Sequence, residues 1–184
     1  MRKLILLLTI VYSTVLFSQN DFAAYFHKQD SIFQLNTGKL YPAFSVVSLE
    51  GKRITEKELT GKVTIINFWF QYCEPCVAEF DALNDLYLKF KDNAAFRFIS
   101  FTSDSSDESK ESVEKYKLAF PVCPVSQQEC YRLNMNQGFP TTIIIDKAGR
   151  MAFLKSGGNT EKDNVLQQIT NYEQKIKSLL EIQQ

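Results

Sequence analysis

Residues 62–80 decide the fold of this chain, and they read KVTIINFWFQYCEPCVAEF. The first part, residues 62–70, is β-branched and apolar almost throughout, which is typical of a central strand covered on both faces. From Cys73 on, apolar residues recur every three or four positions, which predicts an amphipathic helix of about four turns. These residues are Val77, Phe80, Leu83, Tyr87 and Phe90. The stretch therefore predicts a buried strand that leads directly into a helix.

Two cysteines lie at the junction of this strand and helix, in the sequence Cys73-Glu74-Pro75-Cys76. At this spacing they can close a small disulfide ring. Cys73 would lie at the helix N-terminus, where unpaired backbone N–H groups and the helix dipole stabilise a thiolate. Because the thiolate is the nucleophile in disulfide exchange, we expect Cys73 to attack and the more buried Cys76 to resolve the mixed disulfide. Pro75 suits the first helical turn, where its missing N–H is no loss.

The chain has two further cysteines, and a CxxC pair can also be half of a zinc site. The other candidate zinc ligands are His27, Cys123 and Cys130, and the six residues between the last two do not match a zinc knuckle. We therefore expect no metal, and no phosphate-binding motif points to another cofactor. For Cys123 and Cys130 we expect a structural disulfide, which needs Cα atoms within about 7 Å. Two buried free thiols or a second redox couple are the alternatives.

The N-terminus has the pattern of a targeting segment. Arg2 and Lys3 precede an apolar run over residues 4–17, which is shorter than the roughly 20 residues of a membrane-spanning helix. We expect residues 1–18 to be a cleaved signal peptide, with an uncleaved anchor as the alternative. Residues 19–37 would follow as a short extension, with a helix only weakly indicated. The mature chain would then work outside the cytoplasm, where disulfides persist.

The rest of the chain, residues 38–184, predicts a single α/β domain. Strands alternate with helices and are followed by a terminal hairpin and a final helix, which favours a mixed sheet flanked by helices. The predicted strands cover residues 44–49, 62–70, 96–102, 120–123, 141–146 and 150–155, and a turn over 50–52 makes the first of them half of a hairpin. We interpret Gly157-Gly158 as a turn and Trp69 as a core residue. Since 21 basic residues balance 21 acidic ones, no basic surface indicates nucleic-acid binding.

Three motifs together carry a resemblance to a known family. NFWFQYCEPCVAEF, with GFPTTIIID downstream and YPAFSVVSLEGK upstream, resembles the thioredoxin superfamily, in its extracytoplasmic TlpA/ResA-like branch of thiol-disulfide oxidoreductases. The resemblance implies a thioredoxin-like fold with an added N-terminal β-hairpin. It implies that Cys73 is the exposed nucleophile and Cys76 the resolving thiol. It also implies that Pro140 is a cis-proline that faces the disulfide and helps to dock substrates, and that Glu79 lies near the active site.

Three positions depart from the family pattern or from thioredoxins proper. Tyr72 replaces the usual Trp before the first cysteine; another aromatic can cover the thiol, so the change bears on substrate preference more than on activity. Asp81 stands where the family often has Pro, which removes the expected cause of a helix kink. Asn67 replaces the buried Asp of thioredoxins proper, as it does in the ResA-like branch. Glu79 is then the candidate proton acceptor, and the alternative is an ordinary solvated carboxylate.

The sequence therefore predicts an extracytoplasmic thiol-disulfide oxidoreductase that acts on protein disulfides. The charge of Glu74 disfavours a thiolate on Cys73, so we expect a reductase rather than an oxidase. The resemblance implies a membrane thiol-electron donor as partner and, if it extends that far, apocytochrome c thiols as substrates. A thiol peroxidase is the first alternative, but residues 66–73 lack the Pro and the Ser or Thr of the peroxidatic motif. A non-enzymatic binding or chaperone module around Phe139 and Pro140 is the second, and it would not need both thiols.

Overall fold

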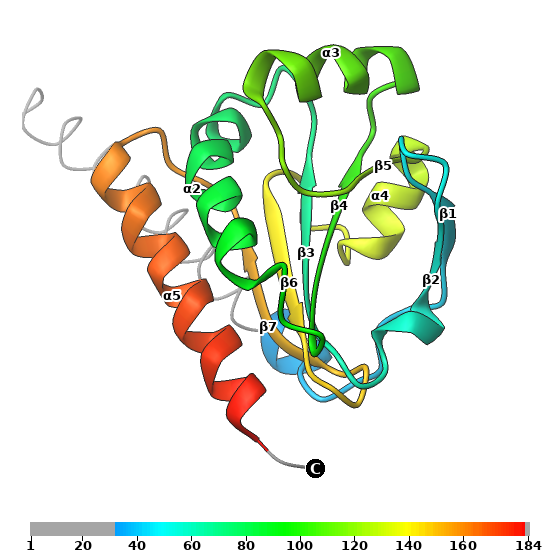
Figure 1. Ribbon diagram of the computed structural model, residues 1–184, viewed down its shortest axis with the longest axis vertical. Coiled ribbons are helices and arrows are strands. Elements are labelled where there is room, and N and C mark those ends of the chain that lie inside the picture. Colours follow the sequence, from blue (N-terminus) through cyan, green and yellow to red (C-terminus); the bar gives the residue numbers. More distant parts are fainter. Residues whose placement is uncertain (1–31, 183–184) are drawn as a thin grey trace, which may run out of the picture. The chain divides into compact units, whose positions relative to one another are not determined.

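A five-stranded mixed sheet forms the centre of the protein, in the order β5-β4-β3-β6-β7 (Figure 1). The structure, a computed structural model, describes residues 32–182, and the fold given below is that of the unit from Asn36 on. Parallel pairing joins β3 to β4 and β4 to β5, whereas β6 and β7 run antiparallel to their neighbours. The strands are β3 (Val63–Trp69), β4 (Phe96–Thr102), β5 (Val122–Pro124), β6 (Thr141–Ile145) and β7 (Met151–Ser156). The predicted thioredoxin-like sheet is confirmed.

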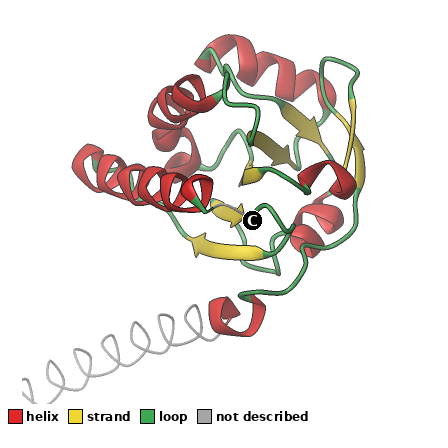
Figure 2. Ribbon diagram, turned by 60° about the horizontal axis from the view of Figure 1, so that its bottom comes forward, coloured by secondary structure: helices red, strands yellow, loops and turns green. Residues whose placement is uncertain are grey.

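The central strand, β3, is buried along its whole length, because both faces of the sheet are covered. On one face it packs under the helices α2 (Glu74–Phe90) and α5 (Lys162–Glu181). Trp69 is fully buried there, with its ring edge-on to Phe80, which confirms it as a core residue. On the other face Phe68 packs against Phe101, which in turn contacts Phe44. Figure 2 shows helices on both sides of the strands.

The helices begin and end where local side chains favour it. α2 starts after Cys73 with Pro75 in its first turn, and it runs through Asp81 to Phe90. α3 (Ser106–Tyr116) begins at a capping box formed by Ser105 and Glu108. α4 (Gln127–Leu133) is capped by Ser126. The final helix is confirmed as α5, and its buried residues recur every three or four positions: Val165, Ile169, Tyr172, Ile176 and Leu179.

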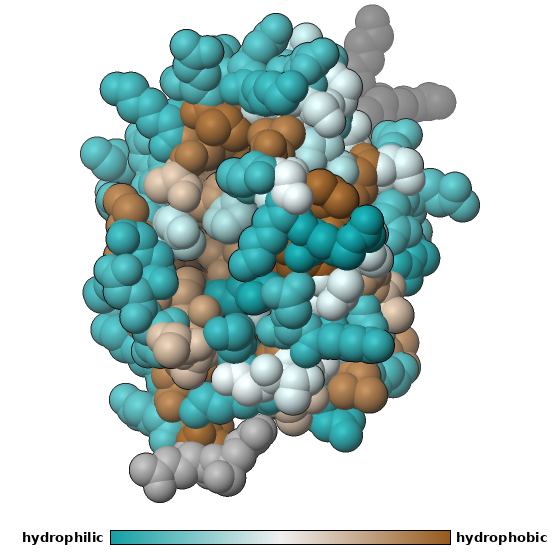
Figure 3. All heavy atoms as spheres, turned by 45° about the vertical axis from the view of Figure 1, so that its right-hand side comes forward, coloured by the Kyte–Doolittle hydropathy of each residue, from teal (hydrophilic) through white to brown (hydrophobic). Residues whose placement is uncertain are grey.

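A two-stranded hairpin precedes the central sheet, as predicted. β1 (Ser45–Val47) pairs antiparallel with β2 (Arg53–Thr55), and the short 3-10 helix η1 (Glu56–Leu59) follows. The turn between the strands needs Gly51, whose φ of 79° is favourable only for glycine. Both strands are short, so the hairpin covers little more than the edge of the domain. On the part of the face drawn in Figure 3 that the structure describes, apolar side chains lie in separate patches among hydrophilic ones.

The predicted signal peptide, residues 1–18, lies outside the described residues, as do His27 and most of the extension over 19–37. Residues 32–36 are helical. Within residues 32–182, no helix is both long enough and apolar enough to span a bilayer.

Candidate active site

The two cysteines of the CxxC motif form a disulfide at the start of α2. Cys73 is the N-cap residue of the helix, and its Sγ accepts a hydrogen bond from the backbone N–H of Cys76 at 3.3 Å. The Cα atoms of the two cysteines are 5.2 Å apart. The backbone N–H of Cys76 is one of the four that a helix leaves unpaired at its N-terminus. The same contact would stabilise a thiolate on Cys73 when the disulfide is reduced.

In the disulfide form both active cysteines are buried. Cys73 is 5% exposed and Cys76 is 1% exposed. The sulfur of Cys73 is bonded to Cys76 in the first turn of α2, so the exposure of Cys73 as a reduced nucleophile stays a prediction. Tyr72 does not cover the sulfur as the sequence allowed, because its side chain is 82% exposed.

The cis-proline segment and a glycine meet at the site. The Phe139–Pro140 peptide bond is cis, the geometry that the resemblance implies, and it lies directly before β6. A Cβ atom placed on Gly158 would lie 2.7 Å from Cγ of Pro140, 3.0 Å from Cβ of Pro75 and 2.9 Å from Oε1 of Glu79. Side chains from α2 and from the segment before β6 therefore meet the backbone of the segment after β7 here. Gly158 is a site residue that the sequence analysis missed.

Replacement of Gly158 by Ala is expected to disturb this junction. No real Cβ tolerates a contact of 2.7 Å with the rigid ring of Pro140, so the ring or the carboxyl of Glu79 must move. Overpacking of this kind costs about 1–3 kcal/mol. Urea unfolding should show this loss together with slower thiol exchange, whereas the nearby exposed change Lys162→Ala should show neither. Unchanged stability and rate in Gly158→Ala would contradict this packing.

Glu79 is a buried carboxyl group one helical turn beyond Cys76. Its side chain is 1% exposed, so the alternative of a solvated helix carboxylate is wrong. Oε1 accepts a hydrogen bond of 2.8 Å from Nε2 of Gln168, and no described residue gives a partner to Oε2. Burial raises the pKa of Glu79 to about 7, and the hydrogen bond from Gln168 and the charge of Lys155 act in the opposite direction. A carboxyl with this pKa can accept and release a proton near neutral pH.

Asn67 occupies the position of the buried Asp of thioredoxins proper. It is buried in β3, and its Nδ2 donates to Oγ1 of Thr142 on β6 at 3.0 Å. Its Oδ1 has no partner among the described residues. Since an amide cannot take a proton at neutral pH, Glu79 is the buried acid–base group nearest to Cys76 along α2.

Comparison with known proteins places the chain in a family. The model of the AhpC/TSA family matches residues 37–153. The chain is also 32% identical to the thiol-disulfide oxidoreductase ResA of Bacillus cereus, over 96% of this chain and 99% of the relative. The chain belongs to the AhpC/TSA family, among its ResA-like thiol-disulfide oxidoreductases. The thioredoxin-like protein YneN of Bacillus subtilis is 28% identical, over 70% of this chain and 76% of the relative.

Solved structures show the same fold. A putative protein disulfide isomerase from Bacteroides thetaiotaomicron gives a TM-score of 0.69 at 23% identity, and covers 79% of this chain and 91% of its own. A putative thiol:disulfide interchange protein DsbE from Chlorobium tepidum gives 0.64 at 22% identity, with 74% and 96% covered. Both likenesses support the thioredoxin-like fold of this AhpC/TSA family member.

The second cysteine pair lies outside the CxxC motif. Cys123 in β5 and Cys130 in α4 are free and fully buried, so the expected structural disulfide is absent and the alternative of two buried thiols describes them. Burial raises the pKa of each thiol to about 12. Because exchange needs a thiolate, both are inert near neutral pH and act as small apolar core residues.

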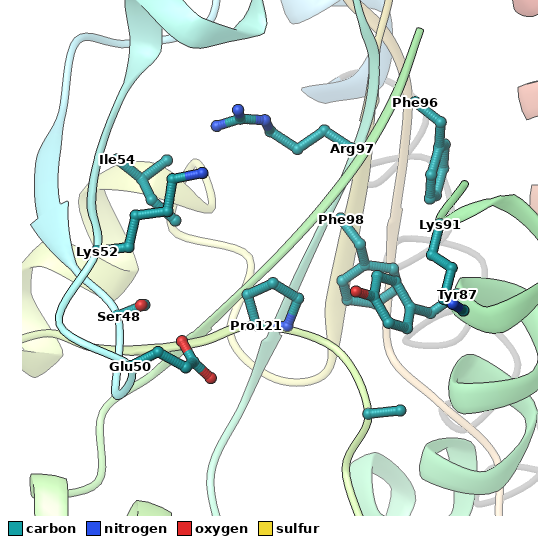
Figure 4. Close-up of a pocket in the computed structure, with 11 residues that line it drawn as sticks. Ser48, Glu50, Lys52, Ile54, Tyr87, Lys91, Phe96, Arg97, Phe98 and Pro121 are labelled. Carbon is teal, nitrogen blue, oxygen red and sulfur yellow. The ribbon is translucent and has the colours of Figure 1, made fainter. Parts of the chain in front are cut away.

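Two grooves differ in their relation to the disulfide. A groove of about 450 Å³ lies between the hairpin, α2 and β4, where Lys52 and Arg97 point toward each other (Figure 4). None of its lining residues belongs to the CxxC site. Another groove, of about 420 Å³, borders the motif and is lined by Tyr72, Glu74 and Tyr116 among others. No described group of three or more His, Cys, Asp or Glu side chains is arranged to hold a metal ion.

Proposed function

We propose that this ResA-like protein is an extracytoplasmic reductase that transfers two electrons from its Cys73/Cys76 dithiol to disulfides of protein substrates. The observation that carries this proposal is the Cys73–Cys76 disulfide at the N-terminus of α2, with the buried carboxyl of Glu79 one turn further on. The N-terminus of α2 favours a thiolate on Cys73, and the carboxyl of Glu79 can take the proton of Cys76. Dithiol exchange needs both an attacking thiolate and a base for the second thiol.

The exchange would proceed in two steps. The Cys73 thiolate attacks one sulfur of the substrate disulfide, forms a mixed disulfide and releases one substrate thiolate. The Cys76 thiol then gives its proton to Glu79, and its sulfur attacks Sγ of Cys73. The Cys73–Cys76 disulfide forms, and the second substrate thiolate leaves. The substrate gains two electrons and the protein loses two. A dithiol donor must then reduce the protein again.

The groove beside the motif supports docking of an extended substrate segment. Its lining includes the exposed Tyr72 and Glu74, which flank Cys73 in the sequence, and Tyr116 of α3. The cis Phe139–Pro140 bond lies directly before β6. We assign Pro140 to substrate docking because its ring lies next to Gly158, and Pro75 of the CxxC motif lies next to the same glycine.

The location and partners rest on the sequence of residues 1–18 and on the resemblance to the ResA-like branch. We assign the protein to the periplasm or an equivalent extracytoplasmic compartment, after cleavage of residues 1–18. A membrane-bound thiol donor would reduce it there, and apocytochrome c thiols are the candidate substrates. N-terminal sequencing of the native protein should begin near Gln19 or Asn20. Recovery of Met1 in the membrane fraction would contradict cleavage.

Glu74 sets the direction of exchange in this proposal. It is the first residue of α2, exposed and adjacent to Cys73. Replacement by Gln is expected to move the titration of the Cys73 thiol to lower pH, by up to about one pH unit, because a neighbouring negative charge is removed. The reduced form gains stability, so the couple becomes more oxidising by up to about 30 mV.

Ultraviolet absorbance of the thiolate measures the titration, and glutathione buffers measure the potential. Asp81→Asn is the matched control, because Asp81 is an exposed acid on the same helix. It should change neither quantity. A titration of Cys73 in Glu74→Gln that is unchanged or moved upward would contradict the assigned influence of Glu74.

Reduction of insulin disulfides in the presence of a dithiol tests the activity itself. We expect catalysis by the wild-type protein and none by Cys73→Ser. Consumption of a hydroperoxide measured in parallel tests the thiol peroxidase alternative. Peroxide turnover without insulin reduction would overturn the proposed function.

A further inference from the structure

The side-chain amide of Gln168 lies between the buried carboxyl of Glu79 and the phenol of Tyr172. Gln168 is half-buried on α5, 89 residues away from Glu79 in the sequence. Its Nε2 donates one hydrogen bond of 2.8 Å to Oε1 of Glu79 and one of 2.7 Å to the hydroxyl oxygen of Tyr172. An amide nitrogen has two hydrogens, so both are used.

This arrangement leaves the two oxygens of Glu79 unequal. Oε1 is bonded to Gln168, and Oε2 is buried with no partner among the described residues. Most buried polar atoms are hydrogen-bonded, so a buried acceptor without a partner calls for an explanation. Cys76 precedes Glu79 by three residues on α2, which puts the two side chains on the same side of the helix.

We propose that Gln168 is a positioning residue for thiol exchange: by bonding to Oε1 it holds Glu79 in one orientation and leaves Oε2 as the oxygen that accepts the proton of Cys76. This inference rests on the role of Glu79 in the proposed function. It adds a residue on a different helix, one that none of the sequence motifs contains.

The position of Gln168 is supported by buried polar side chains of other elements. Its partner Tyr172 is almost fully buried, and the hydroxyl of Thr142 on β6 lies near the phenol of Tyr172. Thr142 in turn accepts a hydrogen bond from Nδ2 of Asn67 on β3. On its other side Gln168 borders a small groove of about 240 Å³ between β7 and α5. The amide thus separates the carboxyl of Glu79 from that groove.

Three titratable groups face Glu79 from the elements around it. Lys155 of β7 favours the ionised carboxylate, Tyr172 of α5 lies beyond Gln168, and Cys76 of α2 carries the proton to be transferred. Pro75, Pro140 and Gly158 complete the surroundings and have no charge. The bond from Gln168 favours the ionised carboxylate against burial, so its removal should raise the pKa of Glu79 above about 7.

The test compares Gln168→Met with Gln167→Met in the full-length protein. Met keeps an unbranched side chain of similar size but donates no hydrogen bond. Gln167 is the exposed neighbour on α5 and serves as the matched control. Carbon-13 NMR of the Glu79 carboxyl, assigned with Glu79→Gln, measures its pKa. This pKa is expected to rise by about one pH unit in Gln168→Met and to stay unchanged in the control.

Kinetics give a second readout that a merely structural role would not produce. Reduced protein is mixed with 5,5′-dithiobis(2-nitrobenzoate), and the second release of thionitrobenzoate reports the attack of Cys76 on the mixed disulfide. With half of Glu79 ionised near pH 7 in the wild type, Gln168→Met is expected to slow this release about fivefold there. The rates should become equal at about pH 9 and above. In a Glu79→Gln background, Gln168→Met should have no further effect.

The outcomes separate this inference from the proposed function. An unchanged titration of Glu79 in Gln168→Met, or a slowing that is equal at all pH values, would overturn the role of Gln168. If the titration moves but the wild-type protein reduces no protein disulfide, the proposed function fails and the bond to Glu79 stands. Should Gln168→Met not fold, Gln168→Glu replaces it. A second carboxyl beside Glu79 must raise the pKa of one of the two carboxyls if the residues are in contact.

Discussion

Replacement of Cys76 by Ser is expected to arrest the protein as a mixed disulfide with its substrate through Cys73. Cys73 caps α2, where the helix N-terminus stabilises its thiolate, so it should attack first. Without the resolving thiol the intermediate cannot collapse, and insulin reduction should fall at least about 10³-fold in both Cys73→Ser and Cys76→Ser. Mass spectrometry of the trapped adduct after proteolysis identifies the sulfur involved.

Two control variants sharpen this prediction. Cys123→Ala in the Cys76→Ser background should trap the same adduct, and so should Cys130→Ala, because both thiols are buried and protonated. Trapping through Cys76 in Cys73→Ser would reverse the assigned roles of the two active cysteines.

Replacement of Glu79 by Gln is expected to change both catalysis and stability. Loss of the proton acceptor should slow resolution of the mixed disulfide about 10²-fold near pH 7, which is the usual contribution of a positioned base. The second release of thionitrobenzoate measures this rate. Resolution at the wild-type rate in Glu79→Gln would show that the proton of Cys76 leaves by another route.

The effect on stability follows from the raised pKa of Glu79. The folded protein holds the proton up to about pH 7, whereas the unfolded chain releases it near pH 4.5. The folded state therefore binds more protons between these values, and its stability falls as pH rises through this window. The total loss is about 3 kcal/mol.

Urea unfolding of the oxidised protein across this range measures that loss. Glu79→Gln should abolish the part that Glu79 contributes, and the exposed acid variant Asp85→Asn should retain it. A wild-type stability that rises by the same amount between about pH 4.5 and pH 7 would contradict the buried state of Glu79.

Local sequence patterns predicted the features of the fold that depend on neighbours along the chain. The predicted strand over residues 96–102 has the bounds of β4, and the apolar period after Cys73 gave α2. The predicted strand over 120–123 instead begins at Val122 and ends at Pro124. An edge strand tolerates a proline at that point, because its outer side needs no ladder hydrogen bond. These elements need only burial periodicity and breaker residues to be recognised.

The site was only partly predictable, because several of its contacts join distant segments. Cys73, Cys76 and Glu79 lie within one motif, and the spacing on a helix already relates them. Gly158 and Gln168 lie far along the chain from that motif, and no local pattern distinguishes them from a turn glycine and a surface glutamine. Their contacts depend on how β7 and α5 pack against α2.

The errors concern side-chain exposure, which residue type alone does not decide. An aromatic residue at position 72 can cover the thiol, but the position of Tyr72 between β3 and α2 leaves its side chain in solvent. Cys123 and Cys130 were expected to pair because of their compartment and spacing. In the structure the side chain of each is fully buried, and a free thiol packs there as well as an apolar side chain.

The reduction potential of the Cys73–Cys76 couple tests the central claim, a reductase acting through this dithiol, most directly. The protein is equilibrated with glutathione buffers and the fraction of disulfide is measured by alkylation and mass spectrometry. Because Glu74 disfavours the Cys73 thiolate, we expect a potential nearer to the about −270 mV of thioredoxin than to the about −120 mV of a strong oxidant. A couple as oxidising as the latter would contradict the assignment as a reductase.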